Sequence, residues 1–148
     1  MSPRKERTRV VLDTNVLINF ILSRTSQSAA TRIVKLWFRE RKLQLVLSNE
    51  VIAEYYEILE RVGADERKVE HLYDLLSRIS IVTFVNLGTR FNLSRDPDDN
   101  VLLATAQAGN AEYLITNDYD LLDISARDKK RFRFVIVKPA EFLAKFEN

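Results

Sequence analysis

The sequence contains no cysteine, only three glycines and a single histidine among its 148 residues. A chain without cysteine has no disulfide, no thiolate metal site and no cysteine nucleophile, which is typical of proteins from a reducing cytoplasm. With so few glycines there is no glycine-rich loop of the P-loop or dinucleotide-binding kind. Zinc sites built from cysteine and histidine are disfavoured, and we interpret His71 as a structural residue.

An excess of one charge is also missing, because 23 basic residues face 21 acidic ones and the net charge is only +2. Global charge therefore does not by itself indicate a nucleic-acid-binding protein. Long hydrophobic runs are missing as well. The apolar stretch from Val10 to Leu22 is interrupted by Asp13, Asn15 and Asn19, which signal peptides and membrane spans do not normally carry. We expect a soluble, cytoplasmic protein with no membrane association.

Hydrophobic residues make up 46% of the sequence, which is ample for one core. We expect residues 1–148 to form a single domain. Basic residues gather near the start of the chain and again between Arg127 and Arg133, whereas acidic residues gather at Asp96, Asp98 and Asp99. Each basic run alone is most typical of a solvated face or a tail, and we interpret residues 1–8 as a flexible basic tail.

Short β-branched runs alternate with segments of helical periodicity along the whole chain. Strands are predicted at 9–12, 43–47, 81–85, 113–116 and 133–137. Helices are predicted at 16–22, 26–41, 49–62, 65–80 and 97–108 and after Pro139, and 88–95 is the least patterned stretch. This alternation predicts a three-layer α/β/α fold with a central, mainly parallel sheet between helices.

Two acidic residues lie just after predicted strands. Asp13 comes after the first strand, and Asp118 comes shortly after the strand at 113–116. Ligands of open parallel sheets bind outside the carboxyl ends of the strands, so both acids are candidates for one site. Asp99 lies in the first turn of the preceding helix, and a short crossover would bring it to the same edge.

Two acidic groups have an alternative structural interpretation. Asp96 is a good N-cap before Pro97, and acids in a first turn favour the helix dipole, so the group at 96–99 can be explained by capping alone. On a helical wheel of 49–62, Glu54 lies about 100° from the centre of the apolar stripe and Glu50 and Glu57 lie farther away. Glu54 is thus the glutamate best placed to reach inward, although an ordinary surface glutamate also fits.

Carboxylates that converge on one crevice repel one another unless a cation neutralises them. Ligands that are all hard oxygens favour Mg²⁺ or Mn²⁺. An acidic site of this kind, which needs no nucleophilic serine, cysteine or histidine, suits phosphodiester hydrolysis, in which metal ions activate water and stabilise the leaving oxygen.

Three stretches together resemble the PIN-domain nucleases, namely "VVLDTNVLI", "LSNEVIAEYYEILER" and "RDPDDNVLLATAQAGNAEYLITNDYDLL". Their order and spacing cover nearly the whole chain. The resemblance implies a metal-dependent ribonuclease whose four catalytic acids are Asp13, Glu54, Asp99 and Asp118. Asp13, Asp99 and Asp118 would hold one or two ions of Mg²⁺ or Mn²⁺. Glu54 would orient or deprotonate the attacking water, and in-line displacement would leave a 5′-phosphate and a 3′-hydroxyl.

The resemblance also implies accessory polar positions near the metal, at Asn15, Thr116, Asp120 and Asp96. Asp96 and Asp98 lie beside the third acid and could replace it in alignment, but "DNVLLATA" fits the start of the family's helix best at Asp99. Basic side chains would hold the RNA backbone, and the candidates are Arg127, Lys129, Lys130 and Arg131.

Within the family, the chain resembles the VapC-like toxins of toxin–antitoxin pairs. That likeness implies cleavage of single-stranded or structured RNA, a small antitoxin as protein partner, and a homodimer. Two alternatives stay open: a catalytically inactive PIN fold that binds RNA or protein, and a structure-specific DNA nuclease. The presence of all four acids argues against the first, and the short length of the chain argues against the second.

Overall fold

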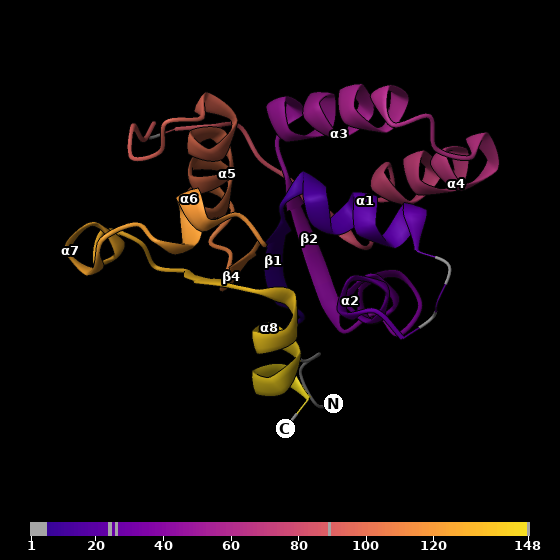
Figure 1. The fold of residues 1–148 in the computed structure, drawn as a ribbon. Coiled ribbons are helices and arrows are strands. Elements are labelled where there is room, and N and C mark those ends of the chain that lie inside the picture. Colours follow the sequence, from indigo (N-terminus) through magenta and orange to yellow (C-terminus); the bar gives the residue numbers. More distant parts are fainter. Residues whose placement is uncertain (1–5, 24, 26, 89, 148) are drawn as a thin grey trace.

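The structure, a computed structural model, describes residues 6–23, 25, 27–88 and 90–147. Five parallel strands form the central sheet (Figure 1). They are β1 (Thr8–Leu12), β2 (Leu43–Leu47), β3 (Val82–Phe84), β4 (Tyr113–Ile115) and β5 (Val135–Val137), in the order β3-β2-β1-β4-β5. The first strand therefore lies in the middle of the sheet, and the predicted parallel α/β architecture is confirmed.

Eight helices connect and cover the strands in the described part of the chain. They are α1 (Thr14–Leu22), α2 (Ala29–Phe38), α3 (Asn49–Arg61), α4 (Glu66–Leu76), α5 (Pro97–Ala108), α6 (Tyr119–Leu122), α7 (Ala126–Lys129) and α8 (Pro139–Phe146). The α5 helix packs on β1, β2 and β4, and α2 packs on β2 and contacts α1 and α8. Figure 1 shows α5 and α2 on opposite sides of the strands, which gives the three layers.

Continuously apolar strands are buried on both faces, as a sheet between two helical layers requires. Val10, Val11 and Leu12 of β1 are fully buried. On one side, the indole of Trp37 donates a hydrogen bond of 2.8 Å from Nε1 to the Ile81 carbonyl. Each such large apolar side chain contributes roughly 1.5–3 kcal/mol when it is removed from water. The core therefore fixes the strands that carry the polar residues at their ends.

The strand register brings two chain segments to the same edge of the sheet. Leu12 of β1 is paired with Ile115 of β4. The next residues continue the pairing, because Asp13 N donates to the Ile115 carbonyl over 3.0 Å and Thr116 N donates to the Val137 carbonyl over 2.9 Å. The chain runs from β1 to β2 in one direction and returns to β4 on the other side of β1. This reversal of strand order creates the crevice in which parallel sheets bind ligands.

The expected flexible tail over residues 1–8 is wrong at its last two positions. Thr8 begins β1 and pairs with Leu43, and the Arg7 guanidinium donates a 2.6 Å hydrogen bond to the Ser80 carbonyl. Ladder pairing and this contact between distant segments hold the chain here. Residues 1–5 of the expected tail lie outside the described residues.

Several helices and strands are shorter than predicted, and two helices were not predicted. The α4 helix ends at Leu76 rather than near residue 80, and β5 begins at Val135 rather than residue 133. The helices α6 and α7 have four residues each, too few to show an apolar periodicity. Their signals were the capping residues Asp118 and Ser125, whose side chains accept hydrogen bonds from the first turn of each helix.

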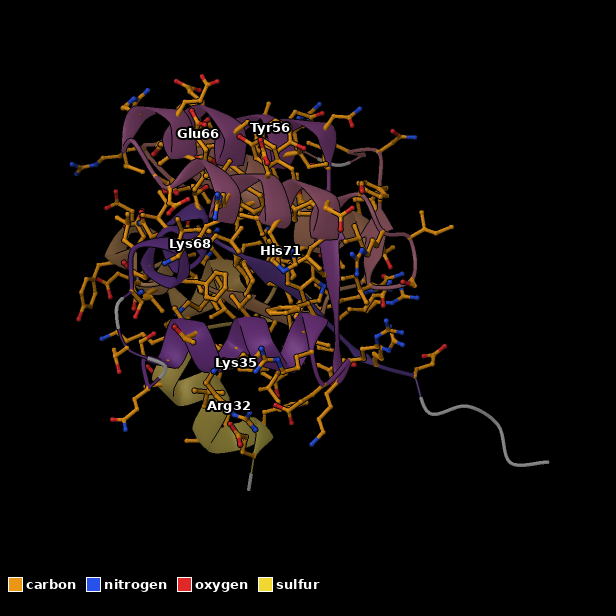
Figure 2. The ribbon with its side chains drawn as sticks, turned by 90° about the vertical axis from the view of Figure 1, so that its right-hand side faces the viewer. Arg32, Lys35, Tyr56, Glu66, Lys68 and His71 are labelled. Carbon is orange, nitrogen blue, oxygen red and sulfur yellow. The ribbon has the colours of Figure 1, made fainter. Side chains whose placement is uncertain are left out.

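Figure 2 views the face on which α2, α3 and α4 lie. His71 of α4 is exposed on this face, and its ring packs edge-to-face against Phe38 with centroids 5.9 Å apart. A largely apolar hollow of about 280 Å³, which Lys68 and His71 help to line, lies between α1, α2 and α4. In the described part of the chain, no helix combines the length and the apolar character needed to cross a bilayer.

Candidate active site

Three carboxylates meet at the carboxyl edge of the sheet. Asp13 follows β1, Asp118 follows β4 and Asp99 lies in the first turn of α5. One oxygen atom from each of these residues lies within 4.8 Å of the other two. Asp13 and Asp99 are buried, at 5% and 4% exposure. The sequence predicts these three acids at one edge, from two strand ends and a short crossover, and the structure brings them together there.

Helix capping explains the position of Asp96 but not that of the buried Asp99. The Asp96 side chain accepts a 2.9 Å hydrogen bond from Asp98 N and caps α5, and Pro97 occupies the first turn. Asp96 and Asp98 are exposed, whereas Asp99 is buried against the cluster. The structural interpretation therefore holds for Asp96, and Asp99 is the acid of this group that joins Asp13 and Asp118.

Each of the three carboxylates accepts a hydrogen bond that fixes its orientation. Thr116 Oγ1 donates to Asp13 Oδ2 over 2.6 Å and also accepts from Asp118 N over 2.9 Å. Ser94 Oγ donates to Asp99 Oδ2 over 2.8 Å. The Asp118 side chain itself accepts from Asp120 N over 2.9 Å as the cap of α6. Sequence reasoning did not find Ser94, because it lies in the unpatterned stretch before α5.

Glu54 reaches the site from α3 and is half-buried. Burial raises the pKa of its carboxyl to about 7, and the nearby negative charges of Asp98 and Asp13 contribute to that increase. The hydroxyl of Thr14 lies beside Glu54 and opposes the increase, yet this buried Oγ1 has no hydrogen bond of normal geometry. Glu54 thus faces the cluster without belonging to its closest three carboxylates.

The site holds more negative charge than its protein surroundings neutralise. Burial raises the pKa of Asp99 to about 7, and Asp118 and Asp13 repel the charge of its carboxylate. Burial also raises the pKa of Asp13. A divalent cation would remove this repulsion, and a donor set made only of carboxylate and hydroxyl oxygens suits Mg²⁺ or Mn²⁺.

Comparison of the sequence with known protein families identifies the family of this chain. The sequence profile of the PIN domain family matches residues 9–120, which include all four acids. The chain belongs to the PIN domain family. The resemblance inferred from the three sequence stretches is therefore confirmed at the level of the family.

Two further matches extend over most of this PIN domain. An uncharacterized protein of Methanocaldococcus jannaschii is 29% identical over 155 aligned positions, which cover 97% of this chain and 95% of the relative. A crystal structure of VapBC2 from Rickettsia felis, bound to a DNA fragment from their promoter, contains a similar chain. That chain matches with a TM-score of 0.57 and 15% identity, covering 88% of this protein and 98% of the neighbour, so it supports the fold alone.

The other polar positions expected near the metal divide into two groups in this PIN domain. Thr116 is buried and binds Asp13 directly. Asn15, Asp96 and Asp120 are exposed, and neither of the two aspartates is among the three clustered carboxylates. One contact that the sequence did not reveal is made by Tyr55, whose buried hydroxyl donates to the Leu12 carbonyl at the end of β1. This hydrogen bond ties α3, and hence Glu54, to the strand that ends at Asp13.

The basic run expected to bind RNA lies on and after α7, at the periphery of the molecule (Figure 1). Lys129 Nζ donates a 2.6 Å hydrogen bond to the Leu122 carbonyl. The Arg131 guanidinium lies 5.5 Å from the centroid of the Phe91 ring. Lys129 is half-buried, whereas Arg127, Lys130 and Arg131 are exposed. An RNA-binding role for the run remains a prediction.

Proposed function

We propose that this PIN domain is a metal-dependent ribonuclease that hydrolyses phosphodiester bonds of single-stranded or structured RNA. The observation that carries the proposal is the meeting of Asp13, Asp99 and Asp118 within 4.8 Å, with Glu54 facing them. The family to which the chain belongs supports the same conclusion. All four acids expected from the resemblance are present, which argues against a catalytically inactive PIN fold.

In this proposal the chain's own residues perform three tasks. Asp13, Asp99 and Asp118 hold Mg²⁺ or Mn²⁺, and the hydrogen bonds from Thr116 and Ser94 fix two of these ligands. The bound ion would polarise the phosphate and lower the pKa of water. Glu54 accepts the proton of the attacking water, a role for which a pKa of about 7 is well matched near neutral pH.

We further propose that the enzyme is the toxin of a toxin–antitoxin pair, held inactive by a small antitoxin protein, and that it forms a homodimer. The support is the fold that it shares with a chain of VapBC2 from Rickettsia felis. Expression of the chain alone, compared with co-expression of any short reading frame that adjoins its gene, tests this role. Growth arrest that the neighbour relieves would support it, and unimpaired growth on expression alone would contradict it.

Asp13→Asn tests the chemistry of the proposed ribonuclease. The amide keeps an oxygen that accepts from Thr116 but removes a metal-binding charge, so we expect Mg²⁺-dependent cleavage of labelled single-stranded RNA to fall at least about 100-fold. Asp74→Asn is the matched control, because Asp74 is an exposed aspartate of α4 whose side chain pairs with Arg78. Circular dichroism checks that both variants fold.

The proposal would be overturned if Asp13→Asn cleaved RNA as fast as the wild-type protein. Flapped DNA serves as the second substrate in the same assay. Faster cleavage of flapped DNA than of single-stranded RNA would replace the ribonuclease proposal by the structure-specific DNA nuclease.

A further inference from the structure

Tyr119 combines an unusual degree of exposure with a position at the active site. It directly follows Asp118 and is 60% exposed, the highest value among the exposed aromatic side chains of the described residues. Consecutive Cα atoms are 3.8 Å apart, so the backbone of Tyr119 lies next to that of Asp118, which carries one of the three clustered carboxylates. Exposed aromatic rings beside nucleic-acid sites serve as platforms on which bases stack.

The Tyr119 ring is held at one end and open on its face. Lys138 Nζ donates to the Tyr119 hydroxyl over 2.7 Å and lies 4.6 Å from the ring centroid. These two distances place the ammonium group at the hydroxyl end rather than over the ring. The ring is therefore oriented without being covered by this lysine.

An open hollow of about 410 Å³ adjoins this ring between the segment before α5 and the segment around α6 and α7. Its volume lies within the range of about 300–1,000 Å³ that small-ligand sites occupy. Tyr119, Ser94 and Arg95 all line it, and Ser94 also donates to Asp99 of the acidic cluster. The hollow and the candidate metal site therefore share a wall.

That wall is held by the side chain of Asn100. Asn100 Oδ1 accepts from Leu93 N over 2.9 Å and from Ser94 N over 3.0 Å, and its Nδ2 donates to the Ser94 carbonyl over 3.0 Å. These hydrogen bonds position Ser94 and its neighbour Arg95 before any ligand arrives. Arg95 also lines a second hollow beside Phe91 and Pro97, so this residue borders both hollows.

The polar groups that line the hollow are mostly hydrogen-bond acceptors. Asp120, Asp123 and Asp128 contribute carboxylates. The hydroxyl of Ser125 is already used, because it donates to Asp128 over 3.1 Å. Carboxylates repel a phosphate but accept from the amino groups of cytosine, adenine and guanine. Uracil presents a carbonyl oxygen where cytosine presents an amino group, so it fits this lining less well.

We propose that Tyr119 and the adjoining hollow form a base-binding subsite for the nucleotide next to the scissile phosphate, with preference for a base that carries an exocyclic amino group. The inference rests on the proposed ribonuclease function. Tyr119 stacks on the base, Asp123 accepts from the amino group, and Arg95 lies where the charged backbone leaves the hollow.

The test measures the anisotropy of short fluorescent oligo(C) and oligo(U) RNAs with Ca²⁺ in place of Mg²⁺. We expect the wild-type protein to bind oligo(C) more tightly than oligo(U). Tyr119→Ala should weaken oligo(C) binding about tenfold, and Tyr119→Phe should change it less than about twofold, because stacking requires the ring and not the hydroxyl. Asp123→Asn should reduce the preference for oligo(C).

Tyr56→Ala is the matched control for the loss of a surface tyrosine. Tyr56 is 37% exposed on α3, packs against Tyr73 and belongs to the face seen in Figure 2. Removal of this ring should leave oligo(C) binding unchanged. Equal weakening by Tyr56→Ala and Tyr119→Ala would overturn the subsite.

The two proposals fail separately. If Tyr119→Ala binds oligo(C) as well as the wild-type protein does, the subsite is wrong, even where the wild-type preparation cleaves RNA. If binding depends on Tyr119 while the wild-type protein cleaves no RNA with Mg²⁺ or Mn²⁺, the subsite stands and the ribonuclease proposal is wrong. In an active preparation, Tyr119→Ala should raise KM more than it lowers kcat, because it leaves the acidic cluster in place.

Discussion

The charge of the acidic cluster makes the stability of the metal-free protein depend on pH. In the folded protein Glu54 and Asp99 each have a pKa of about 7, whereas the ordinary values are 4.5 and 3.8. The folded state therefore holds protons that the unfolded chain has already released. The contribution of these two groups to stability should be greatest below about pH 4, should fall as the pH rises toward 7, and should level off above about pH 8.

The size of this loss follows from the same pKa values. An increase from 3.8 to about 7 for Asp99 corresponds to about 4 kcal/mol if the group were wholly removed from water. Water reaches the half-buried Glu54 and the mouth of the cluster, so screening reduces the effect, and we expect roughly 2 kcal/mol for the two groups together. In a chain of this length, that change moves the melting temperature by roughly 4–8 °C.

Thermal unfolding followed by circular dichroism measures the effect at pH 5 and pH 8, each with EDTA or with MgCl₂. Mg²⁺ should raise the melting temperature at pH 8, because the bound cation neutralises the ionised carboxylates. The increase should be much smaller at pH 5, where the folded site is largely protonated. Asp99→Asn should raise the stability of the metal-free protein at pH 8 and should remove most of the stabilisation by Mg²⁺.

Asp74→Asn is the control for the general effect of removing a surface carboxylate, and it should behave like the wild-type protein. The reasoning is refuted if Mg²⁺ and Mn²⁺ leave the melting temperature at pH 8 unchanged. It is also refuted if Asp99→Asn is as sensitive to pH as the wild-type protein, because the titrating group would then lie elsewhere.

Two further predictions concern the elements that carry the site. Asn100→Ala removes three hydrogen bonds around Ser94, so it should lower the free energy of unfolding by about 2 kcal/mol in urea denaturation and weaken Mg²⁺ stabilisation. At Gly109, an added Cβ would lie 2.2 Å from Val46 Cγ1 of β2, so Gly109→Ala should cost about 1–3 kcal/mol. Gly88→Ala is its control, because a Cβ at Gly88 meets nothing within 4 Å and should change stability little.

The sequence predicted the sheet and two of the clustered acids for a single physical reason. Buried parallel strands are continuous apolar runs, and the first polar residue after such a run marks the carboxyl edge of the sheet. Asp13 follows β1 in this way, and Asp118 follows β4 after Thr116 and Asn117. The order of the strands in the sheet could not be predicted in this way, because it depends on which strands pair, and no local sequence pattern encodes that pairing. Asp13 meets Asp118 because β1 and β4 are neighbours in the sheet.

Residues that act through a loop left no periodic signal. Ser94 lies in the loop before α5 and contacts Asp99, whereas Tyr119 begins the four-residue helix α6 and contacts Lys138. Apolar periodicity indicates which face of a helix or strand is buried, and it gives no signal in loops or in very short helices. In such segments a functional residue can be found only from its position near another site residue in the sequence or from helix capping. Asp118 is an example, because it both caps α6 and joins the cluster.

Helix geometry determines which of the acidic residues at the start of α5 joins Asp13 and Asp118. Successive residues of a helix differ by about 100°, so Asp98 and Asp99 cannot face the sheet together. Leu102 and Leu103, three and four residues after Asp99, are buried against the strands, and Asp99 therefore projects from the same side of the helix. The apolar contacts that fix α5 on the sheet thus also hold a carboxylate against Asp13 and Asp118, although its charge is costly there. A bound cation is the group that would make this arrangement favourable.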